Sequence, residues 1–179
     1  EGFSFHRNPT RLGITIMFQT PSEAIEFCLV KSLAMIHRMV DDLKPEEFEK
    51  QPCPGGNCAS WILGHLLLTE RRVLGMLGQA VPPLPPGFEE KFATTRQAAG
   101  VQSGYGDPKL LVSEFDRHRQ LLVEAIRQAD QKQLETALEN PHPLFGKIGE
   151  AAMFMGLHVM MHVGQLSTIR RVLGYPPVA

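Results

Sequence analysis

The chain has 179 residues, of which 43% are hydrophobic and 21% are charged, and its formal net charge is −1. This length and composition are typical of one globular domain, and we expect a single domain over residues 17–179, with residues 1–16 as an N-terminal extension ahead of Met17. The nearly neutral charge, without a basic block, argues against binding to nucleic acid or to a membrane surface.

The first predicted element is a helix from about residue 20 to residue 43. Its start is marked by Thr20 as the N-cap, Pro21 in the first turn and Glu23, which completes a capping box. Apolar residues then recur at helical spacing, namely Ile25, Leu29, Leu33, Ile36 and Val40. The period predicts one buried face along this helix.

A loop rich in proline and glycine, residues 52–58, precedes the second predicted helix. We expect this helix to begin near Asn57 or Ser60 and to end at Leu77. The following stretch, residues 79–106, contains the sequence VPPLPPG, which breaks regular structure. It is long for a connection within a compact domain, so we expect either a functional loop or a short helix there.

Asp107 and Pro108 open a third predicted helix, which runs to about Ala129. A loop with the sequence ENPHPLFGK then leads to a fourth helix, from about Lys147 to Leu173. No segment shows convincing strand alternation. Four long amphipathic helices predict an all-α fold, an antiparallel-type four-helix bundle.

Three histidines lie on predicted core faces. His158 and His162 are about 40° and about 6 Å apart on the fourth helix, and His65 shares its face of the second helix with apolar residues. Buried imidazoles need partners, and one divalent metal could collect all three while leaving a coordination position open. A single buried histidine is more often a hydrogen-bonded core residue than a ligand. Val159 also stands where the zinc-protease motif HExxH has glutamate, so both interpretations stay open at this point.

Two motifs resemble the DinB-like (DNA-damage-inducible) superfamily of four-helix metalloproteins. They are SWILGHL at residues 60–66 and HVMMHVGQLSTIRRVLGYPP at residues 158–177, and the resemblance extends over essentially residues 18–177. It implies that His65, His158 and His162 bind one divalent metal ion in the core of the bundle. Zinc or nickel is the expected ion, because imidazole suits both.

The resemblance also implies the kinds of chemistry to expect. Superfamily members include thiol S-transferases that act with low-molecular-weight thiols such as bacillithiol, and a mycothiol-dependent maleylpyruvate isomerase. We therefore expect a metal-dependent enzyme acting on a small molecule, with such a thiol as a candidate co-substrate. The alternative is a non-catalytic, metal-stabilised bundle that binds a ligand. A third alternative, a metal-free interaction module, requires all three histidines to be structural.

Candidates for auxiliary catalytic roles each have a structural explanation as well. Arg72 could meet an anionic substrate, or could be an ordinary surface arginine. Tyr105 could donate a proton from its loop, or could be a turn aromatic. Gln165 could support a metal ligand, or could be a polar residue at the helix boundary. Thr69 lies one turn from His65 on the same face.

The other titratable residues have weaker claims. His37 and His118 flank apolar stripes, and we expect both to be partly exposed. The three cysteines, Cys28, Cys53 and Cys58, do not form a disulfide framework, which predicts a reducing, cytoplasmic protein. Cys58 lies near the His65 face, where we expect an inert buried thiol.

The second and fourth helices are apolar on more than one side. Opposite the histidine faces lie Met153, Gly156, Leu157, Met160 and Gly164 on the fourth helix and Leu63, Leu67 and Leu74 on the second. A helix that is apolar all round must be covered all round. Either residues 79–106 or a second copy of the chain could provide the cover, and we favour a homodimer through these two helices.

Overall fold

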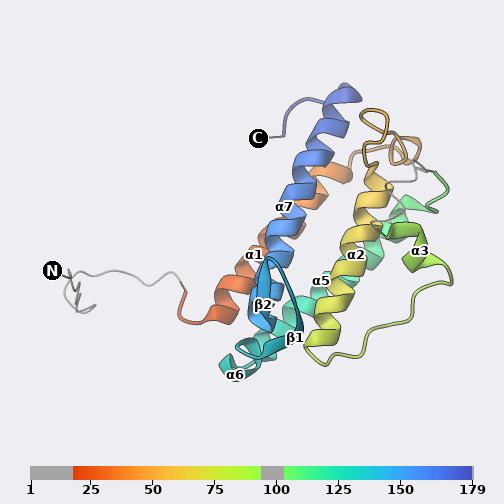
Figure 1. Cartoon of the computed structure of the whole chain (residues 1–179). Helices are drawn as coiled ribbons and strands as arrows, with labels where there is room; N and C mark the ends of the chain where they lie inside the picture. The colour runs from red at the N-terminus through yellow and green to blue at the C-terminus, as the bar shows by residue number, and fades with distance from the viewer. Residues whose placement is uncertain (1–17, 94–102, 179) are drawn as a thin grey trace, which may run out of the picture.

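Four long helices form the body of the molecule (Figure 1). In the computed structural model, which describes residues 18–93 and 103–178, they are α1 (Pro21–Val40), α2 (Ala59–Met76), α5 (Pro108–Gln128) and α7 (Ile148–Val172). The predicted four-helix bundle is thus confirmed. Thr20 caps α1 by accepting a hydrogen bond from the backbone N–H of Glu23, as its sequence indicates. The expected extension, residues 1–16, lies outside the described residues.

Several short elements connect the long helices. They are the 3-10 helix η2 (Pro45–Glu47), the helices α3 (Phe88–Phe92) and α6 (Gln131–Leu134), and the strands β1 (Ala137–His142) and β2 (Phe145–Lys147). The two strands correct the expectation of a plain loop before the fourth helix. They pair antiparallel, with Ala137 opposite Lys147 and His142 opposite Phe145. Because β1 is almost wholly exposed, it has no buried face, and hydropathy alternation cannot mark it.

Each long helix packs against two others. α1 and α2 both lie between α5 and α7 and are diagonal to each other. The hydrogen bond between Asn57 and Gln165 and the contact between Thr69 and His158 show that α2 and α7 run antiparallel. By contrast, α2 and α5 run parallel, and so do α1 and α7, as the colours in Figure 1 show. The bundle is therefore up-down-down-up in chain order.

The parallel arrangement of α2 and α5 explains the long connection between them. α2 has 18 residues, so the chain must return over about 27 Å before α5 can begin in the same direction. The connection carries α3, which agrees with the expectation of a short helix there. The ring of Phe92, at the end of α3, is fully buried at 0% exposure against α2. The crossover is thus packed onto the bundle.

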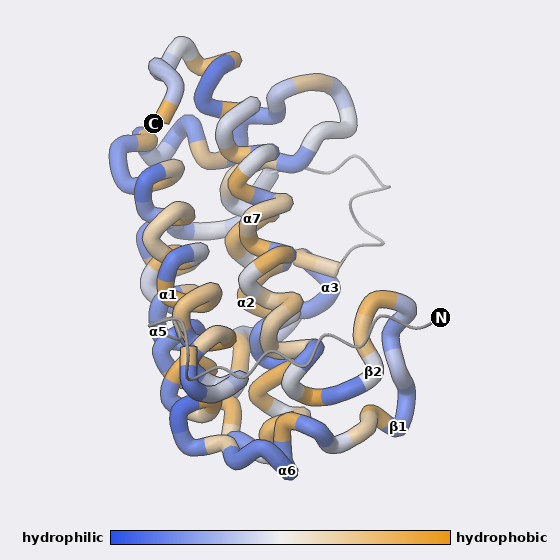
Figure 2. The backbone as a smooth tube through the Cα atoms, turned by 90° about the vertical axis from the view of Figure 1, so that its left-hand side faces the viewer, coloured by the Kyte–Doolittle hydropathy of each residue, from blue (hydrophilic) through white to orange (hydrophobic). Residues whose placement is uncertain are grey.

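The core lies between the four long helices, and hydrophobic residues run along the central α2 and α7 in Figure 2. α2 is the most deeply buried of them, and Leu63, Leu67 and Leu74 are at most 1% exposed within the single chain. These leucines therefore need no second copy to cover them, and this part of the dimer argument does not hold. None of the described helices combines the length and the apolar character that crossing a bilayer requires.

A buried ion pair joins three of the helices. Glu70 of α2 accepts a hydrogen bond from Arg119 of α5, and both side chains are 1% exposed. Arg119 also donates to the backbone carbonyl of Leu29 and to the hydroxyl of Ser32 on α1, each at 3.1 Å. Breaking such a pair from one side would leave an uncompensated buried charge. The pair fixes how α1, α2 and α5 meet.

Candidate metal centre

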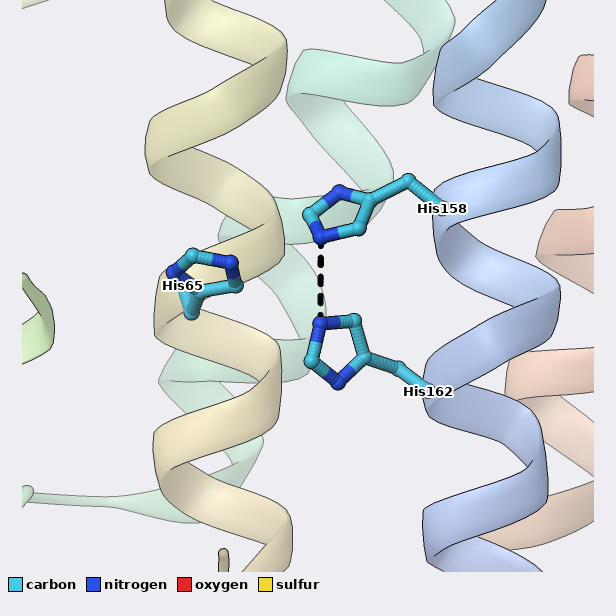
Figure 3. Close-up of side chains that lie close together, drawn as sticks. All are labelled: His65, His158 and His162. Atoms are coloured by element: carbon cyan, nitrogen blue, oxygen red, sulfur yellow. Dashed lines mark hydrogen bonds between the residues drawn. The ribbon is translucent and has the colours of Figure 1, made fainter. Parts of the chain in front are cut away.

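His65, His158 and His162 meet at the seam between α2 and α7 (Figure 3). Each offers one ring nitrogen, and these three atoms all lie within 4.8 Å of one another. The Nε2 atoms of His158 and His162 are 3.1 Å apart, and His65 faces the pair from α2 with ring centroids 5.2 and 5.3 Å away. Within the described part of the chain, this cluster contains three imidazoles and no carboxylate.

The outer nitrogen of His162 is held by a side-chain amide. Its Nδ1 lies 3.1 Å from Oε1 of Gln165, and the same oxygen accepts a hydrogen bond of 3.1 Å from Nδ2 of Asn57. Because an amide oxygen can only accept, we assign the proton of His162 to Nδ1. The lone pair on Nε2 then points to the centre of the cluster.

The outer nitrogen of His158 faces a hydroxyl group. Oγ1 of Thr69 donates a hydrogen bond of 2.8 Å to the backbone carbonyl of Leu66. Its remaining lone pairs are therefore free to accept from Nδ1 of His158, which lies 3.5 Å away. This arrangement again leaves Nε2 unprotonated and directed at the centre.

His65 is oriented from two sides. The backbone of Phe92 lies beside its ring, and the ring stacks on Trp61 with the ring centroids 4.7 Å apart and the planes within 8°. A carbonyl or side-chain acceptor behind a ligand histidine fixes its tautomer and its orientation. His158 and His162 are thus each supported from behind by an acceptor on this chain, and His65 is held by the ring of Trp61 and the backbone of Phe92.

The chemistry of these donors fits a divalent metal ion. Two Nε2 lone pairs facing each other at 3.1 Å repel unless a cation or a proton lies between them. Burial lowers the pKa of His65 to about 4 and that of His158 to about 3, and the charge of a neighbouring protonated His162 adds to both effects. Burial also lowers the pKa of His162. All three are neutral at pH 7, the state that a metal ligand requires.

These pKa values predict how the stability of the metal-free protein depends on pH. In the unfolded chain imidazole titrates near ~6.5, whereas folded His65 and His158 titrate near 4 and 3. Between these values the unfolded state binds more protons, so the free energy of unfolding falls as pH is lowered from about 6.5 toward 4. Thermal melts of the metal-free protein should show a falling Tm over this interval. A variant with glutamine at both positions should show a shallower fall, and equal slopes would contradict the assignment.

A second prediction concerns the hydroxyl behind His158. Thr69→Val keeps the shape of the side chain and removes the acceptor, so we expect metal affinity to fall about 10–100-fold while the fold is retained. Isothermal titration with zinc measures the change. Thr168→Val is the matched control, because the Thr168 hydroxyl bonds only within its own helix, to the carbonyl of Gly164 at 3.2 Å. Equal affinities of the two variants would show that Thr69 does not support the ligand.

The other candidate residues lie at different distances from the cluster. Gln165 contacts His162 directly. Arg72 is exposed on α2, two turns from His65, and its charge contributes to the lowered pKa of that histidine. Tyr105 is 5% exposed, with its ring in the core against Phe92 at 5.2 Å. Burial raises the pKa of the Cys58 thiol to about 11, which makes it a poor metal ligand.

One expectation about the other histidines is wrong. His118 is 0% exposed rather than partly exposed, because Arg71 and the crossover cover the seam between α2 and α5. Its Nδ1 donates to the carbonyl of Glu114 at 2.7 Å, and its Nε2 accepts from Arg71 at 3.1 Å. Both ring nitrogens are therefore satisfied within the fold. His37 is partly exposed, as expected, and lies between Asp41 and Asp116.

Several residues around the cluster are not among the candidates that the sequence suggests. Phe154 stacks on His158 with ring centroids 5.9 Å apart, and its position four residues earlier on the same helix face could have revealed it. The sequence marks Asn57 only as a possible helix start, whereas its side chain donates to Gln165 beside His162. The support from Phe92 is a backbone contact across the crossover, for which the sequence has no signal.

Comparison with known proteins agrees with this picture. Residues 29–166 match the DinB superfamily, and this range contains all three histidines of the cluster. No curated protein gives a significant match. A conserved protein from Enterococcus faecalis has a similar structure, with a TM-score of 0.68 and 17% identity over 86% of this chain and 97% of its own.

A second similar structure is YfiT from Bacillus subtilis, described as a probable metal-dependent hydrolase with an unusual four-helix bundle topology. Its TM-score is 0.64 at 12% identity, over 92% of this chain and 95% of its own. At these identities the two structures show a shared fold. The family match covers well over half of the sequence, and the chain therefore belongs to the DinB superfamily.

Proposed function

We propose that the protein is a metal-dependent enzyme acting on a small molecule, with one divalent ion, zinc or nickel, held by His65, His158 and His162. The observation that carries this proposal is the support behind the cluster. His158 and His162 each have an acceptor at the outer nitrogen, so that their inner nitrogens converge with the lone pairs that a metal needs, and His65 faces them from α2. Histidines with a purely structural role would not need this common orientation. The description of YfiT as a probable metal-dependent hydrolase is consistent with it.

The lack of a carboxylate in the cluster favours a thiol as the nucleophile. When bound, the metal would lower the pKa of a coordinated water or thiol and polarise a carbonyl group. Hydrolysis of a stable bond also needs a general base, and the described cluster offers only its three ligands. A thiol needs only to lose its proton to become a strong nucleophile. We therefore favour transfer to a low-molecular-weight thiol, or a thiol-dependent isomerisation, over hydrolysis.

The residues around the cluster would bind and orient the substrate. Arg72 is the exposed cation nearest to the centre along α2, and it could hold an anionic group. Thr69 and Gln165 keep the ligand rings fixed. Tyr105 is buried in the core, and this position favours the structural explanation for it over proton donation.

A paired assay tests the proposal. Protein loaded with zinc or nickel is mixed with monochlorobimane and either bacillithiol, glutathione or cysteine, and conjugation is followed by fluorescence. Hydrolysis of p-nitrophenyl acetate is followed in parallel. Metal-dependent conjugation that is lost in His158→Ala supports the transferase. Hydrolysis without conjugation would replace the transferase with a hydrolase.

The alternative function is a metal-stabilised bundle that binds a ligand without turnover. It predicts metal uptake and a raised Tm with no product in either assay. A protein that binds neither zinc nor nickel would instead favour the metal-free interaction module. The three outcomes differ in metal content and product, so each can be distinguished from the others.

We further propose that the protein forms a homodimer through the outer face of α7. Leu157, Met160 and Met161 are 58%, 44% and 62% exposed there, an apolar group on the surface of one helix. Gly156 is not part of this face, because it packs against Cys28 of α1. Gly164 has open space beside it, which would admit a close approach of another helix.

Met160→Glu should convert this dimer to a monomer, because it places a charge in an interface expected to bury more than about 1,200 Å² and to be rich in Met and Leu. Light scattering at tens of micromolar protein measures the mass. Gln120→Glu, on the exposed side of α5, the helix diagonal to α7, is the control and should leave the dimer intact. A wild-type protein that is monomeric, or a Met160→Glu variant that remains dimeric, would contradict the proposal.

A further inference from the structure

Among the described residues, protein groups bound the histidine cluster at one end of the seam and leave it more exposed toward the other. At one end Asn57 and Gln165 are hydrogen bonded across α2 and α7. Trp61, 2% exposed, covers one face of His65, and the backbone of Phe92 covers its edge. Toward the β1–β2 hairpin, in contrast, His158 and Thr69 remain partly exposed. A small molecule would therefore reach the cluster from the hairpin side.

A series of rings connects the cluster to the surface on this side. Phe154 lies against His158 at 5.9 Å with the planes within 12°, and Phe145 of β2 follows at 5.4 Å from Phe154. His142 of β1 stacks on Phe145 at 4.7 Å, within 18°. We call His142, Phe145 and Phe154 the aromatic wall. Phe145 and Phe154 are only partly buried, and His142 is exposed.

Anchoring of the hairpin explains why these rings touch one another. It does not explain why the ring of Phe154 beside the histidine cluster, and the ring of Phe145 next to Phe154, both stay partly exposed to water. Aromatic surface next to a polar site is typical of a ligand-binding wall, where ring faces supply contact area and the polar groups fix orientation. The hairpin thus brings aromatic surface to a site that α2 and α7 alone would leave bare.

Across the seam from this wall lies a cation. Because α2 and α7 run antiparallel and Thr69 contacts His158, Arg72 lies about one turn further on and is level with Phe154. Arg72 is exposed; it lines a hollow at the crossover together with Glu89 and Glu90 of α3, but none of the described carboxylates forms an ion pair with it. Its guanidinium is available to an anionic group on a ligand.

We propose that the aromatic wall and Arg72 together select the substrate, which is a planar conjugated or aromatic molecule carrying an anionic group. The planar part stacks on Phe145 and Phe154, and the anionic group pairs with Arg72 beside the histidine cluster. This inference rests on the proposed function, because it assigns the substrate class of that same site. It adds the hairpin, which contains none of the histidine ligands, to the substrate-binding surface.

The test is binding of 2-naphthoate, with acetate as the non-aromatic anion and 2-naphthalenemethanol as the uncharged aromatic compound. Equilibrium dialysis of cobalt-loaded protein gives a dissociation constant for each probe without requiring turnover. The cobalt absorption spectrum reports separately that the metal is bound. We expect 2-naphthoate to bind at least about tenfold more tightly than either other probe, since each loses one of the two contacts.

Variants separate stacking from support of the hairpin. Phe145→Leu keeps an apolar side chain under the hairpin and removes the ring, so affinity for 2-naphthoate should fall about tenfold, while acetate binding is unchanged. Phe145→Tyr keeps the ring and should retain the affinity. Leu144→Ala, at the 65% exposed tip of the hairpin, is the matched control and should have no effect. Arg72→Gln should weaken 2-naphthoate and acetate but not 2-naphthalenemethanol.

The outcomes distinguish this inference from the function on which it rests. A protein that shows no cobalt spectrum overturns the metal-dependent function. A normal cobalt spectrum with 2-naphthoate binding no tighter than acetate overturns the aromatic wall and leaves the metal centre standing. Equal affinity of Phe145→Leu and Phe145→Tyr for 2-naphthoate likewise overturns the aromatic wall and leaves the metal centre standing.

Discussion

His158→Ala and His162→Ala should each reduce bound zinc or nickel from about one ion per chain to none after dialysis, because two imidazoles cannot replace a three-ligand site. The loss of affinity should exceed the roughly 10–100-fold that removal of an outer hydrogen-bond partner causes. Elemental analysis measures the content. Thermal melts give a second measure, since zinc at about 100 times its Kd stabilises a folded protein by about 2.7 kcal/mol, and the variants should lack this gain.

The control for these variants is His37→Ala. His37 lies on α1 between Asp41 and Asp116, and its loss should leave metal content unchanged. His158 is partly exposed, so its replacement should not unfold the bundle, and circular dichroism checks this. Acid should release the metal from the wild type only well below pH ~6.5, because the pKa values of folded His65 and His158 are about 4 and about 3. A wild-type protein without metal and without a zinc-induced rise in Tm would rule out a metal centre.

The long helices and the faces of the three histidines could be predicted from the sequence because both depend on local periodicity. His158 and His162 share a face by their spacing alone, and His65 lies among apolar residues of its own helix. Periodicity does not say which helices are neighbours. The meeting of His65 with the other two could be anticipated only through the resemblance to the DinB-like superfamily.

The direction of each helix could not be predicted from the sequence, for a different reason. An amphipathic pattern is the same whether a helix runs up or down the bundle. Only the length of residues 79–106 hinted that α2 and α5 are parallel, and that length was equally consistent with a loop. The same crossover covers His118 and brings the backbone of Phe92 to His65. Both contacts follow from the path of the chain between the parallel helices α2 and α5, which the sequence does not predict.

The hairpin was missed because its strands have almost no buried face. Its rings contact Phe154 of α7, and contacts between two different elements leave no pattern within the strands themselves. The ion pair between Glu70 and Arg119 is not evident from the sequence either. Charged residues are expected at the surface, whereas both of these side chains are buried. Partners on two other helices, α1 and α2, are what allow Arg119 to be buried.

Gly64→Ala should be among the most damaging single-methyl changes in the chain. A Cβ at residue 64 would lie 2.2 Å from a ring carbon of Phe92, far inside van der Waals contact. Phe92 is fully buried between α2 and the crossover, so its ring would have to leave its packed position on α2. We expect a loss of about 2–4 kcal/mol in the free energy of unfolding, since overpacking or expulsion of a buried ring costs this much. Urea denaturation followed by circular dichroism measures it.

Gly75→Ala is the matched control on the same helix. A Cβ there would meet no atom within 4 Å, and alanine is the better helix former, so this variant should gain about 0.5–1 kcal/mol. The same substitution thus has opposite signs at two positions of α2. Helix propensity alone would predict a gain at both, and a gain at Gly64 would show that Phe92 is not seated against α2.

Gly64→Ala should also weaken the metal centre, although the added methyl group would meet Phe92 and none of the three histidines. Displacing the Phe92 ring moves the backbone group that lies beside His65, and loss of such support lowers metal affinity about 10–100-fold. Zinc titration of Gly64→Ala and Phe92→Leu separates the effects. Phe92→Leu removes the ring but leaves the backbone of residue 92 in place, so this variant should bind zinc nearly as well as the wild type. If Gly64→Ala destabilises the fold yet binds zinc with wild-type affinity, the crossover packs on α2 without positioning His65.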